Sequence, residues 1–248
     1  MLLEGKVALV TGGSRGIGGA ICVALGKVGA RVALTYREQA EAARSVVEVI
    51  QQEGGAALAL KMDVRDRTSI RAALEACCEE FGGLDALVNN AGINKPTDFD
   101  QVTEDDWDEI LSVNLKGPFL CSQEAMPFLR ARGGGSIVNI GSVSGQYGGP
   151  RTAHYAASKA GLISLGQVIA RVGAKDHVRC NTVAAGLISS DMAVSGLQSP
   201  AVKQAAESIP LGRLGTPEEV ANMVVFLTSD ASSYVTAQTM NVNGGLYF

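Results

Sequence analysis

Short apolar runs alternate along this chain with longer segments in which apolar residues recur every three or four positions. The short runs predict β-strands and the longer segments predict helices, because the two patterns match the periods of a strand and of a helix. The predicted strands are Lys6–Thr11, Arg31–Tyr36, Ala56–Lys61, Asp85–Asn89, Ser136–Ile140, Val178–Val183 and Thr239–Val242. The predicted helices span residues 16–28, 39–53, 67–81, 104–130, 152–174 and 216–228. This alternation predicts a doubly wound parallel sheet with helices on both faces.

Two of the predicted helices have clear start signals. Thr216-Pro-Glu-Glu219 places a hydroxyl at the N-cap, a proline at the first helical position and a carboxylate at the third. Thr103 precedes Glu104-Asp105-Asp106, which puts acids at the positive end of the helix dipole. These acidic clusters need no functional explanation.

Length and composition favour one folded domain. The chain has 248 residues, of which 46% are hydrophobic and 19% are charged, and this balance is typical of a well-buried globular core. We therefore expect a single domain over residues 1–248. The stretch Leu187–Pro210 is the least regular, and it predicts either a lid over the substrate site or a plain surface loop.

The charge pattern argues against nucleic acid and membranes as partners. Lysines and arginines total 21 against 25 acidic residues, which gives a net charge of −4, and no long basic run is present. No apolar stretch approaches the ~18 residues of a membrane helix, and the first residues lack the pattern of a signal peptide. We expect a soluble, cytoplasmic protein.

The cysteines indicate neither a disulfide framework nor a metal site. Five cysteines are an odd number without a C-x-x-C pair, and only two histidines are present. Cys22, Cys121 and Cys180 fall in apolar segments, so we expect them to be buried. Cys77 and Cys78 are expected to be ordinary helix residues, and no bound metal is expected.

Tyr155 and Lys159 are the most informative pair of side chains. They lie four residues apart in a predicted helix and therefore share one face. An ammonium stabilises a neighbouring phenolate, so Lys159 is expected to lower the pKa of Tyr155 from its usual value of about 10 and to make it a general acid/base. Ser142 follows the apolar run that ends at Ile140, and open α/β sheets bind ligands at such carboxyl ends of strands. On its own, Tyr-x-x-x-Lys also arises by chance in amphipathic helices.

A second signal lies near the start of the chain, in Thr11-Gly-Gly-Ser-Arg-Gly-Ile-Gly18, which we call the glycine loop. Gly12, Gly16 and Gly18 follow the first predicted strand and open the first predicted helix, which is the context of a dinucleotide-binding loop. Small residues let the backbone approach a pyrophosphate, whose charge suits the N–H groups of a helix N-terminus. The spacing G-x-x-x-G-x-G is one residue longer in its first gap than the common Rossmann fingerprint.

The end of the second predicted strand indicates which cofactor binds. Tyr36-Arg37 offers no acid to an adenosine ribose, whereas a basic group at this place accommodates a 2′-phosphate. Arg37, with Arg15 and Ser14 of the glycine loop, therefore predicts NADP(H) in preference to NAD(H), because guanidinium groups suit phosphate oxygens. The alternative is that Arg15 and Arg37 are two solvated surface arginines.

These residues together resemble the short-chain dehydrogenase/reductase family, whose fold is a single Rossmann-type domain. The motifs that carry the resemblance are Thr11–Gly18, Asn89-Asn-Ala-Gly92, Asn114, Ser142, Tyr155 and Lys159. The similarity extends over essentially the whole chain. The tail segments Pro210–Gly215 and Val242–Phe248 are most similar to the bacterial 3-oxoacyl-[acyl-carrier-protein] reductase group, although many other carbonyl reductases share this style of tail.

The resemblance implies a role for each of four catalytic residues. Tyr155 donates a proton to a substrate carbonyl oxygen while the nicotinamide delivers hydride to its carbon, and Ser142 holds that oxygen. Lys159 binds the nicotinamide ribose and depresses the pKa of Tyr155. Asn114 positions a water in the proton relay, with a buried amide satisfied by backbone as its alternative.

The resemblance assigns further residues to the cofactor and the substrate. Asp63 and Val64 are implied to lie along the adenine, with a turn cap as the alternative for Asp63, and Asn90-Ala-Gly92 lies beside the adenosine ribose. The full expected cofactor set is Gly12, Ser14, Arg15, Gly16, Ile17, Gly18, Arg37, Asp63, Val64, Asn90, Ala91, Gly92, Tyr155, Lys159, Gly186, Ile188 and Ser190. The expected substrate-facing set is Asn94, Ser144, Gln146 and His154. His154 is interpreted as either structural or substrate-facing.

The chain departs from the family pattern near the expected nicotinamide pocket. Ala184-Ala185-Gly186 stands where the family commonly has Pro-Gly, so the loop that enters this pocket loses a φ restraint. Ser190 stands where a threonine is usual and keeps the hydroxyl. The chemistry is expected to survive both changes.

A third departure concerns the partner. Carrier-protein reductases tend to present basic residues beside the active site to an acidic partner. Here Lys175 is followed by Asp176, and Arg130 and Arg132 are the nearby alternatives. This pattern weakens the case for acyl carrier protein as a partner.

The residues and the resemblance together predict an NADPH-dependent ketoreductase. Its substrate is a β-ketoacyl thioester, free or carried on acyl carrier protein, or a similar small ketone. One alternative is an alcohol or sugar dehydrogenase that works oxidatively with the same residues, and another is a non-catalytic nucleotide-binding regulator. The family usually forms tetramers through the helices at 104–130 and 152–174 and the C-terminal region, so a homotetramer is expected, and the apolar ending Leu246-Tyr-Phe248 supports it.

Overall fold

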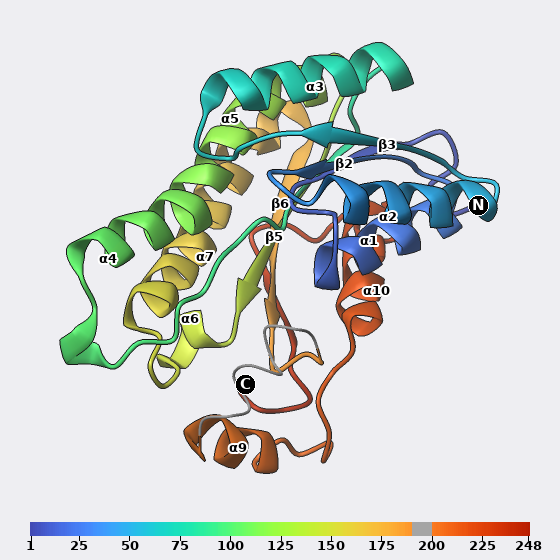
Figure 1. Cartoon of the computed structure of the whole chain (residues 1–248). Helices are drawn as coiled ribbons and strands as arrows, with labels where there is room; N and C mark the ends of the chain where they lie inside the picture. Colours follow the sequence, from blue (N-terminus) through green and yellow to red (C-terminus); the bar gives the residue numbers. More distant parts are fainter. Residues whose placement is uncertain (190–199) are drawn as a thin grey trace.

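The computed structural model describes residues 1–189 and 200–248, which form a seven-stranded sheet covered by helices (Figure 1). The strands are β1 (Val7–Val10), β2 (Arg31–Tyr36), β3 (Ala56–Lys61), β4 (Ala86–Asn89), β5 (Gly135–Ser142), β6 (Val178–Ala185) and β7 (Thr239–Val242). Neighbouring strands are parallel throughout, in the order β3-β2-β1-β4-β5-β6-β7. The predicted parallel sheet is therefore confirmed.

The strand order reverses at β1. The chain runs outward from β1 to β2 and β3, and then crosses back so that β4 pairs with the other side of β1. Open α/β sheets bind ligands outside the carboxyl ends of their strands at such a switch point. The glycine loop after β1 and the segment after β4 therefore meet at the expected binding site.

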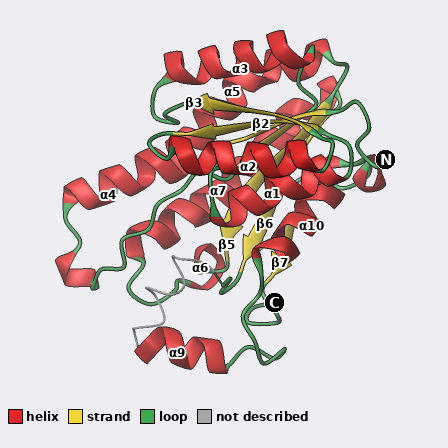
Figure 2. Cartoon of the chain, turned by 45° about the vertical axis from the view of Figure 1, so that its right-hand side comes forward, coloured by secondary structure: helices red, strands yellow, loops and turns green. Residues whose placement is uncertain are grey.

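Two layers of helices cover the sheet (Figure 2). The helices are α1 (Gly16–Lys27), α2 (Ala40–Gln52), α3 (Arg67–Phe81), α4 (Glu104–Leu111), α5 (Gly117–Ala131), α6 (Ser144–Tyr147), α7 (Ala153–Gly173), α9 (Pro200–Glu207) and α10 (Pro217–Thr228). One buried cluster packs α3, α5 and α7 against one face, and a second packs α1, α2 and α10 against the other. In β1, Val7 and Leu9 join the first cluster, and Ala8 and Val10 join the second. Because side chains alternate along a strand, a strand buried on both faces reads as an unbroken apolar run.

The predicted helix over residues 104–130 is interrupted at its centre. A π-helical turn, Ser112–Lys116, separates α4 from α5, and the N–H of Gly117 donates to the carbonyl of Ser112 five residues back. Pro118 contributes to the break, because it has no N–H for an α-helical hydrogen bond to the carbonyl of Asn114. Single π turns are frequent at functional sites, and this one contains Asn114.

Both predicted helix starts are confirmed. The hydroxyl of Thr103 accepts from the N–H of Asp106 at 3.1 Å. At α10, the N–H of Glu219 donates to the Thr216 hydroxyl, and the N–H of Thr216 donates to the Glu219 carboxylate. This reciprocal capping box satisfies two backbone donors that a helix start leaves without partners.

Two short helices lie in segments that the sequence pattern left irregular. Helix α6 follows β5, and α9 occupies part of the stretch after β6. Residues 190–199 of that stretch lie outside the described residues, so its role as a lid stays a prediction. Within residues 1–189 and 200–248, no helix is long and apolar enough to cross a membrane.

The five cysteines are all unpaired. Cys22, Cys121 and Cys180 are buried, as predicted, and Cys77 is buried in α3. Burial raises the pKa of the Cys77, Cys121 and Cys180 thiols to about 12, so these thiols stay protonated and unreactive at neutral pH. The described part of the chain holds no group of three His, Cys, Asp or Glu side chains placed to bind a metal ion.

Candidate active site

Three predicted catalytic side chains converge at the carboxyl end of β5. Ser142 is the last residue of β5, and Tyr155 and Lys159 lie one turn apart near the start of α7. The Lys159 Nζ lies 5.6 Å from the centroid of the Tyr155 ring, and the Ser142 hydroxyl lies close enough to the phenol to lower its pKa. The Ser142 oxygen accepts from the N–H of Ser144 at 3.1 Å, which leaves the hydroxyl proton free for donation.

Burial dominates the pKa of Tyr155. Removing a phenolate from water raises this pKa, and the nearby Ser142 side chain lowers it by a smaller amount. The prediction that the pKa of Tyr155 falls below its usual value is therefore wrong, because the loss of solvation is the largest effect. The phenol stays protonated at neutral pH, which is the form that a proton donor requires.

Lys159 is buried and bound to the backbone of the sheet. It is 4% exposed, and its Nζ donates to the carbonyl of Ile140 at 2.7 Å. Burial lowers its pKa from 10.5 to about 8, with no neighbouring carboxylate among the causes. A Cβ at Gly92 would lie 3.6 Å from this Nζ and 3.3 Å from Asn114 Oδ1, so the glycine keeps space open in front of both groups.

Asn114 joins the segment after β4 to α7. Its Oδ1 accepts from the N–H of Ile93, and its Nδ2 donates to the carbonyl of Ile93 and to the Ser158 hydroxyl. Ser158 in turn donates to the carbonyl of Tyr155 at 2.7 Å. The geometry supports the alternative interpretation of Asn114 as a buried amide satisfied mainly by backbone, and its role toward a water stays a prediction.

Ser158 is a positioning residue that the sequence argument missed. It lies three residues after Tyr155, and a helical serine often donates to a carbonyl three or four residues back. That spacing, inside Tyr155-Ala-Ala-Ser-Lys159, is the signal that could have identified it.

The glycine loop is tied to the segment after β4. Asn90 Nδ2 donates to the carbonyls of Thr11 and Gly12, both at 2.9 Å, and the Thr11 hydroxyl accepts from the N–H groups of Asn90 and Ala91. A Cβ at Gly12 would lie 2.9 Å from the Cα of Ala91, and one at Gly18 would lie 2.2 Å from the Gly12 oxygen. Glycine is therefore required at both positions, and the structure brings these predicted cofactor residues together.

The first turn of α1 faces open space. Gly16 begins the helix at φ +55°, and no atom lies within 4 Å of the position that a Cβ would take. Arg15 is the N-cap residue with an extended backbone, and its side chain does not cap the helix. The first N–H groups, which include those of Ile17 and Gly18, have no partner within the helix. An anionic pyrophosphate beside Ser14 and this turn fits that arrangement.

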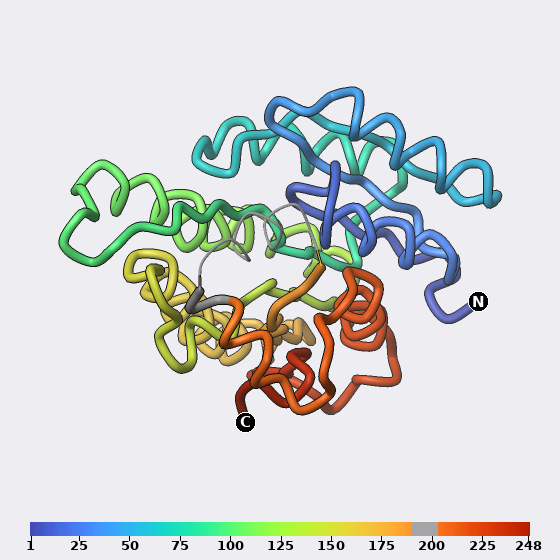
Figure 3. The backbone as a smooth tube through the Cα atoms, turned by 60° about the horizontal axis from the view of Figure 1, so that its bottom comes forward, coloured from blue at the N-terminus to red at the C-terminus, as the bar shows by residue number. Residues whose placement is uncertain are grey.

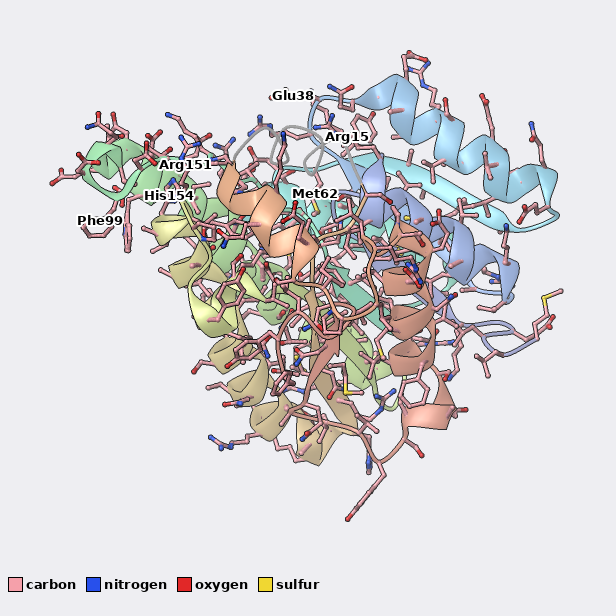
Figure 4. The ribbon with its side chains drawn as sticks, turned by 90° about the horizontal axis from the view of Figure 1, so that it is seen from below. Arg15, Glu38, Met62, Phe99, Arg151 and His154 are labelled. Carbon is pink, nitrogen blue, oxygen red and sulfur yellow. The ribbon has the colours of Figure 1, made fainter. Side chains whose placement is uncertain are left out.

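Arg37 lies at the adjoining strand end. The N–H of Gly13 donates to the carbonyl of Thr35 at 2.9 Å, which joins the glycine loop to the end of β2. The Arg37 guanidinium pairs with the Glu38 carboxylate at 2.6 Å, and Figure 4 shows Glu38 and Arg15 along the same edge of the molecule. Sequence reasoning missed Glu38, although an acid one residue beyond Arg37 was a visible signal. A phosphate at Arg37 competes with this carboxylate.

Asp63 and Val64 follow β3. The Asp63 carboxylate accepts from the N–H and the guanidinium of Arg65, and these hydrogen bonds hold the pKa of Asp63 below its usual value. This geometry supports the alternative interpretation of Asp63 as a turn cap. Val64 is buried, and a Cβ at Gly117 would lie 2.9 Å from its Cγ2, so this valine packs against the start of α5.

Backbone hydrogen bonds join the end of β6 and the segment that follows it to two neighbouring parts of the chain. The carbonyl of Ala185 accepts from the N–H of Val143 at 3.0 Å, and the N–H of Gly186 donates to the carbonyl of Val242 at 2.9 Å. Ile188 is buried and pairs with Gly215 in an isolated bridge. These bonds restrain the loop where Ala185 replaces the usual proline. Ser190 lies outside the described residues, so its contact with the cofactor stays a prediction.

The four predicted substrate-facing residues come from three parts of the chain. Ser144 and Gln146 lie on α6, Asn94 follows β4, and His154 is the second residue of α7. His154 is fully buried, and its Nδ1 accepts from the N–H of Tyr155 at 3.0 Å. Burial lowers the pKa of His154, so it is a neutral group at neutral pH that also supports the first turn of α7.

The C-terminal residues return to α6. Tyr247 stacks on Tyr147 with 5.9 Å between ring centroids. Figure 3 shows the end of the chain on the face that is turned forward in that view. The C-terminus therefore helps to support the helix that follows Ser142.

Arg130 and Arg132 do not lie beside the active site. They stand at the end of α5, just before β5 begins at Gly135, and so they lie at the amino edge of the sheet, where the strands start. Arg130 pairs with Asp176 at 2.6 Å, and Arg132 pairs with Asp85 at 3.1 Å. Neither of these two alternatives to Lys175 therefore lies beside the active site of its own chain.

A protonated phenol and a serine hydroxyl at the end of a parallel strand, next to a glycine loop built for a pyrophosphate, define an oxidoreductase of the nucleotide-binding α/β class. The sequence family described as enoyl-(acyl carrier protein) reductase matches residues 12–247. Together with the relatives below, this match shows that the chain belongs to the short-chain dehydrogenase/reductase family.

The relatives are similar over nearly their whole length. The chain is 42% identical over 242 residues to 3-oxoacyl-[acyl-carrier-protein] reductase FabG of Staphylococcus aureus (strain Mu50), with 98% of each chain covered. It is 41% identical over 246 residues to FabG of Thermotoga maritima, with 99% of each covered. A crystal structure from Sinorhizobium meliloti 1021, assigned as a short-chain alcohol dehydrogenase, superposes with a TM-score of 0.94 at 38% identity and covers 98% of this chain and 97% of that one.

Proposed function

We propose that the chain is an NADPH-dependent ketoreductase that reduces a β-ketoacyl thioester or a similar small ketone to a secondary alcohol. The observation that carries this proposal is the closeness of the Ser142 hydroxyl to the protonated phenol of Tyr155, beside the buried Lys159. Two hydroxyl groups that meet at one point can both bind a single carbonyl oxygen. A ketone suits this pair better than a carbon–carbon double bond does.

The residues present fit a nicotinamide dinucleotide. Gly12, Gly16 and Gly18 leave room for a pyrophosphate beside the first turn of α1. When bound, the cofactor supplies the hydride that reduces the carbonyl carbon. Arg15 and Arg37 would hold the 2′-phosphate of NADPH, because a guanidinium binds phosphate oxygens in a bidentate way.

Ser142 and Tyr155 carry the proton chemistry. The Ser142 hydroxyl donates to the carbonyl oxygen and stabilises the negative charge that develops there. Tyr155 donates its proton to the same oxygen, and it is available as a donor because burial raises its pKa. The Lys159 ammonium, 5.6 Å from the ring centroid, stabilises the phenolate that remains.

A panel of ketones with NADPH tests the proposed reaction. The panel sets acetoacetyl thioesters beside sugars and simple ketones, and NADPH oxidation is followed by absorbance. Tyr155→Phe should lower kcat by about 10²–10⁴-fold, the usual worth of a positioned proton donor, and should leave NADPH affinity nearly unchanged in a fluorescence titration. Substantial activity in this variant would contradict the assigned role, and a lack of turnover by the wild type would favour the nucleotide-binding regulator.

The cofactor preference is tested separately. Arg37→Ala should lower kcat/KM with NADPH by about tenfold to a hundredfold, since a hydrogen bond to a charged group contributes about 1.5–3 kcal/mol, and it should leave kcat/KM with NADH nearly unchanged. Arg44→Ala is the matched control, because Arg44 is an exposed arginine of α2 paired with Glu41. A wild-type preference for NADH would overturn this part of the proposal.

The names of the relatives support two refinements. The FabG relatives favour a 3-oxoacyl group on acyl carrier protein, whereas the pairing of Arg130 and Arg132 with acids removes two candidates for contact with such a partner. The Sinorhizobium protein favours the oxidative direction on an alcohol, for which the same residues work in reverse. Assays of acetoacetyl groups on carrier protein and on coenzyme A, and of secondary alcohols with NADP⁺, separate these cases.

We also propose a homotetramer. A hollow of about 590 Å³ lies over α4, α5 and α7 and is lined by apolar side chains that include Leu111, Leu115, Phe119 and Leu165. Phe119 is 43% exposed in the single chain, and burying such a surface favours association. Light scattering should give a mass about four times 25.7 kDa, and a monomer mass would contradict the proposal.

A further inference from the structure

The helix that carries Tyr155 and Lys159 begins without the usual side-chain cap. Thr152 is the N-cap residue of α7, but its side chain makes no capping hydrogen bond; its hydroxyl instead donates to the carbonyl of Gly149 at 2.7 Å. Helices α3, α4 and α10, by contrast, each have an N-cap side chain that accepts from the first turn. The first N–H groups of α7, which include that of Tyr155, therefore need acceptors from elsewhere.

His154 supplies the acceptor for Tyr155. It is the second residue of α7 (Figure 4), its ring is fully buried, and its Nδ1 accepts from the N–H of Tyr155 at 3.0 Å. At the other backbone group of the same residue, the Ser158 hydroxyl donates to the carbonyl of Tyr155 at 2.7 Å. Both backbone polar groups of Tyr155 are thus bound by side chains of its own helix.

The hydrogen bond from Tyr155 to the ring requires that the ring be neutral. A neutral imidazole has one nitrogen that accepts, whereas both nitrogens of an imidazolium are donors. Protonation of Nδ1 sets two N–H groups against each other and places a positive charge at the positive end of the α7 dipole. Because the ring of His154 is fully buried, it cannot turn away without moving the atoms packed around it. The residue next to it in the chain is Tyr155.

The charged groups that act on the ring form an ion pair with each other. In the part of the chain that the structure describes, they are Lys95, from the segment after β4, and Asp106 of α4, which pair at 2.5 Å. Burial is the main cause that lowers the pKa of His154, Asp106 opposes this change, and Lys95 adds to it. The ring is therefore neutral at neutral pH and takes up a proton only in acid.

We propose that His154 is a positioning residue whose neutral ring holds Tyr155 in place, so that protonation of the ring reversibly switches off the reductase. The neutral ring fixes the first turn of α7 and, with it, the backbone that carries the phenol. Uptake of one proton breaks the hydrogen bond from Tyr155, and release of that proton restores it. The inference rests on the ketoreductase proposed above, in which Tyr155 is the proton donor.

The other titrating groups of the site do not change in the same pH range. Lys159 has a pKa of about 8, and burial raises the pKa of Tyr155, so both keep their protons below neutral pH. A phosphate monoester such as the 2′-phosphate of NADPH titrates at about pH 6. Measuring kcat at saturating NADPH removes its effect on cofactor binding.

The pH dependence of kcat tests the inference. In the wild type, kcat should fall about tenfold per pH unit below the pKa of the folded ring, because one proton is taken up. His154→Asn offers an amide oxygen as the acceptor and does not titrate, so it should keep most of kcat at neutral pH and show no loss in acid. His154→Leu has no acceptor, and it should lower kcat at every pH by about tenfold to a hundredfold, the cost of a misplaced reacting group.

The control and a second measurement need no assumption about the substrate. His177→Asn changes the chain's other histidine, which is exposed at the amino edge of the sheet, and it should keep the loss of kcat in acid. The second measurement is the free energy of unfolding of the unliganded protein against pH. The pKa of His154 lies below 6.5 in the folded chain, so the unfolded state binds more protons just below pH 6.5. Wild-type stability should therefore fall relative to His154→Asn as the pH drops through this range.

The outcomes separate the inference from the proposed function. A loss of kcat in acid that persists in His154→Asn, or full activity of His154→Leu at neutral pH, overturns the inference and leaves the ketoreductase in place. If the wild type reduces no ketone, the proposed function fails, and a stability difference between wild type and His154→Asn that does not change with pH overturns the role of the ring as well. If His154→Leu fails to fold, which circular dichroism would show, the pH profile of His154→Asn decides.

Discussion

The two edges of the sheet differ in whether their charged and polar side chains have partners within the chain. At the amino edge, the Asp85 carboxylate accepts from the N–H of Val7 at 2.8 Å and pairs with Lys6 and Arg132. At the carboxyl edge, Lys159 is buried with no carboxylate contributing to its pKa, and His154 Nε2 has no partner. The amino edge thus has its charges neutralised by partners within the chain. At the carboxyl edge Arg37 and Asp63 are also ion-paired, but the groups around Tyr155 are left without a charged partner, as in active sites generally.

Unusual backbone occurs at both edges, since His177 and Ala237, just before β6 and β7 at the amino edge, have positive φ. The carboxyl edge includes the π turn that holds Asn114 and a residue with positive φ that is not glycine, Arg151, at +55°. Backbone of this kind costs free energy and persists where the surrounding structure enforces it. Here the hydrogen bonds of Asn114 to Ile93 and the pairing of Arg151 with Asp98 supply that support.

The largest expected effect comes from comparing the two ends of one strand. Ser142 ends β5 and Ser136 stands at its start, where the Ser136 hydroxyl donates to the carbonyl of Leu227 at 2.8 Å. Ser142→Ala should lower kcat by about 10²–10³-fold, because it removes a donor to the developing oxyanion. Ser136→Ala should leave kcat unchanged and lower the free energy of unfolding by about 1 kcal/mol. Steady-state kinetics and urea denaturation of both variants measure the contrast, and equal losses of kcat would refute it.

Removing the buried ammonium of Lys159 is expected to have a smaller effect, on the free energy of unfolding. Lys159→Met should raise the free energy of unfolding at pH 7. The pKa shift from 10.5 to about 8 corresponds to an electrostatic cost of about 3 kcal/mol. Loss of the hydrogen bond to the Ile140 carbonyl removes about 1–2 kcal/mol of that gain, so a net gain of about 1–2 kcal/mol is expected.

The pH dependence checks the cause of this gain. The unfolded chain keeps the Lys159 proton up to about pH 10, whereas the folded chain keeps it only to about pH 8. The unfolded state therefore binds more protons between these values, and wild-type stability from this residue rises with pH across that window. The advantage of Lys159→Met should shrink over the same range. An advantage that does not change with pH would point to packing and not to charge.

The sequence was informative wherever the relevant geometry is local. Tyr155 and Lys159 share a helix face because of their spacing, and Ser142 ends a strand whose apolar run is visible. The glycine loop was predictable for the same reason, since Gly12 and Gly18 stand between a strand and a helix. Such features depend on a few neighbouring residues, and the structure confirms their placement.

Features that depend on tertiary packing were not predictable. The pKa of Tyr155 follows from burial by segments far along the chain, and the sign of its shift was therefore wrong. The unpaired Nε2 of His154 is likewise visible only once the fold is known. The position of Arg130 is a different case. Residues just before a strand start lie at the amino edge, so the strand prediction alone was enough to place Arg130 away from the active site.

The smallest expected effect concerns the charge network of the amino edge. Asp85→Asn keeps an oxygen for the N–H of Val7 but loses the ion pairs with Lys6 and Arg132, so the free energy of unfolding should fall by about 1 kcal/mol. Because these pairs are partly exposed, the difference from wild type should decline in 1 M salt. kcat/KM should not change, since the carboxyl edge keeps its own hydrogen bonds. A marked loss of activity with intact folding would show that the two edges are coupled, and that charge pairing at one edge also sets the geometry of the other.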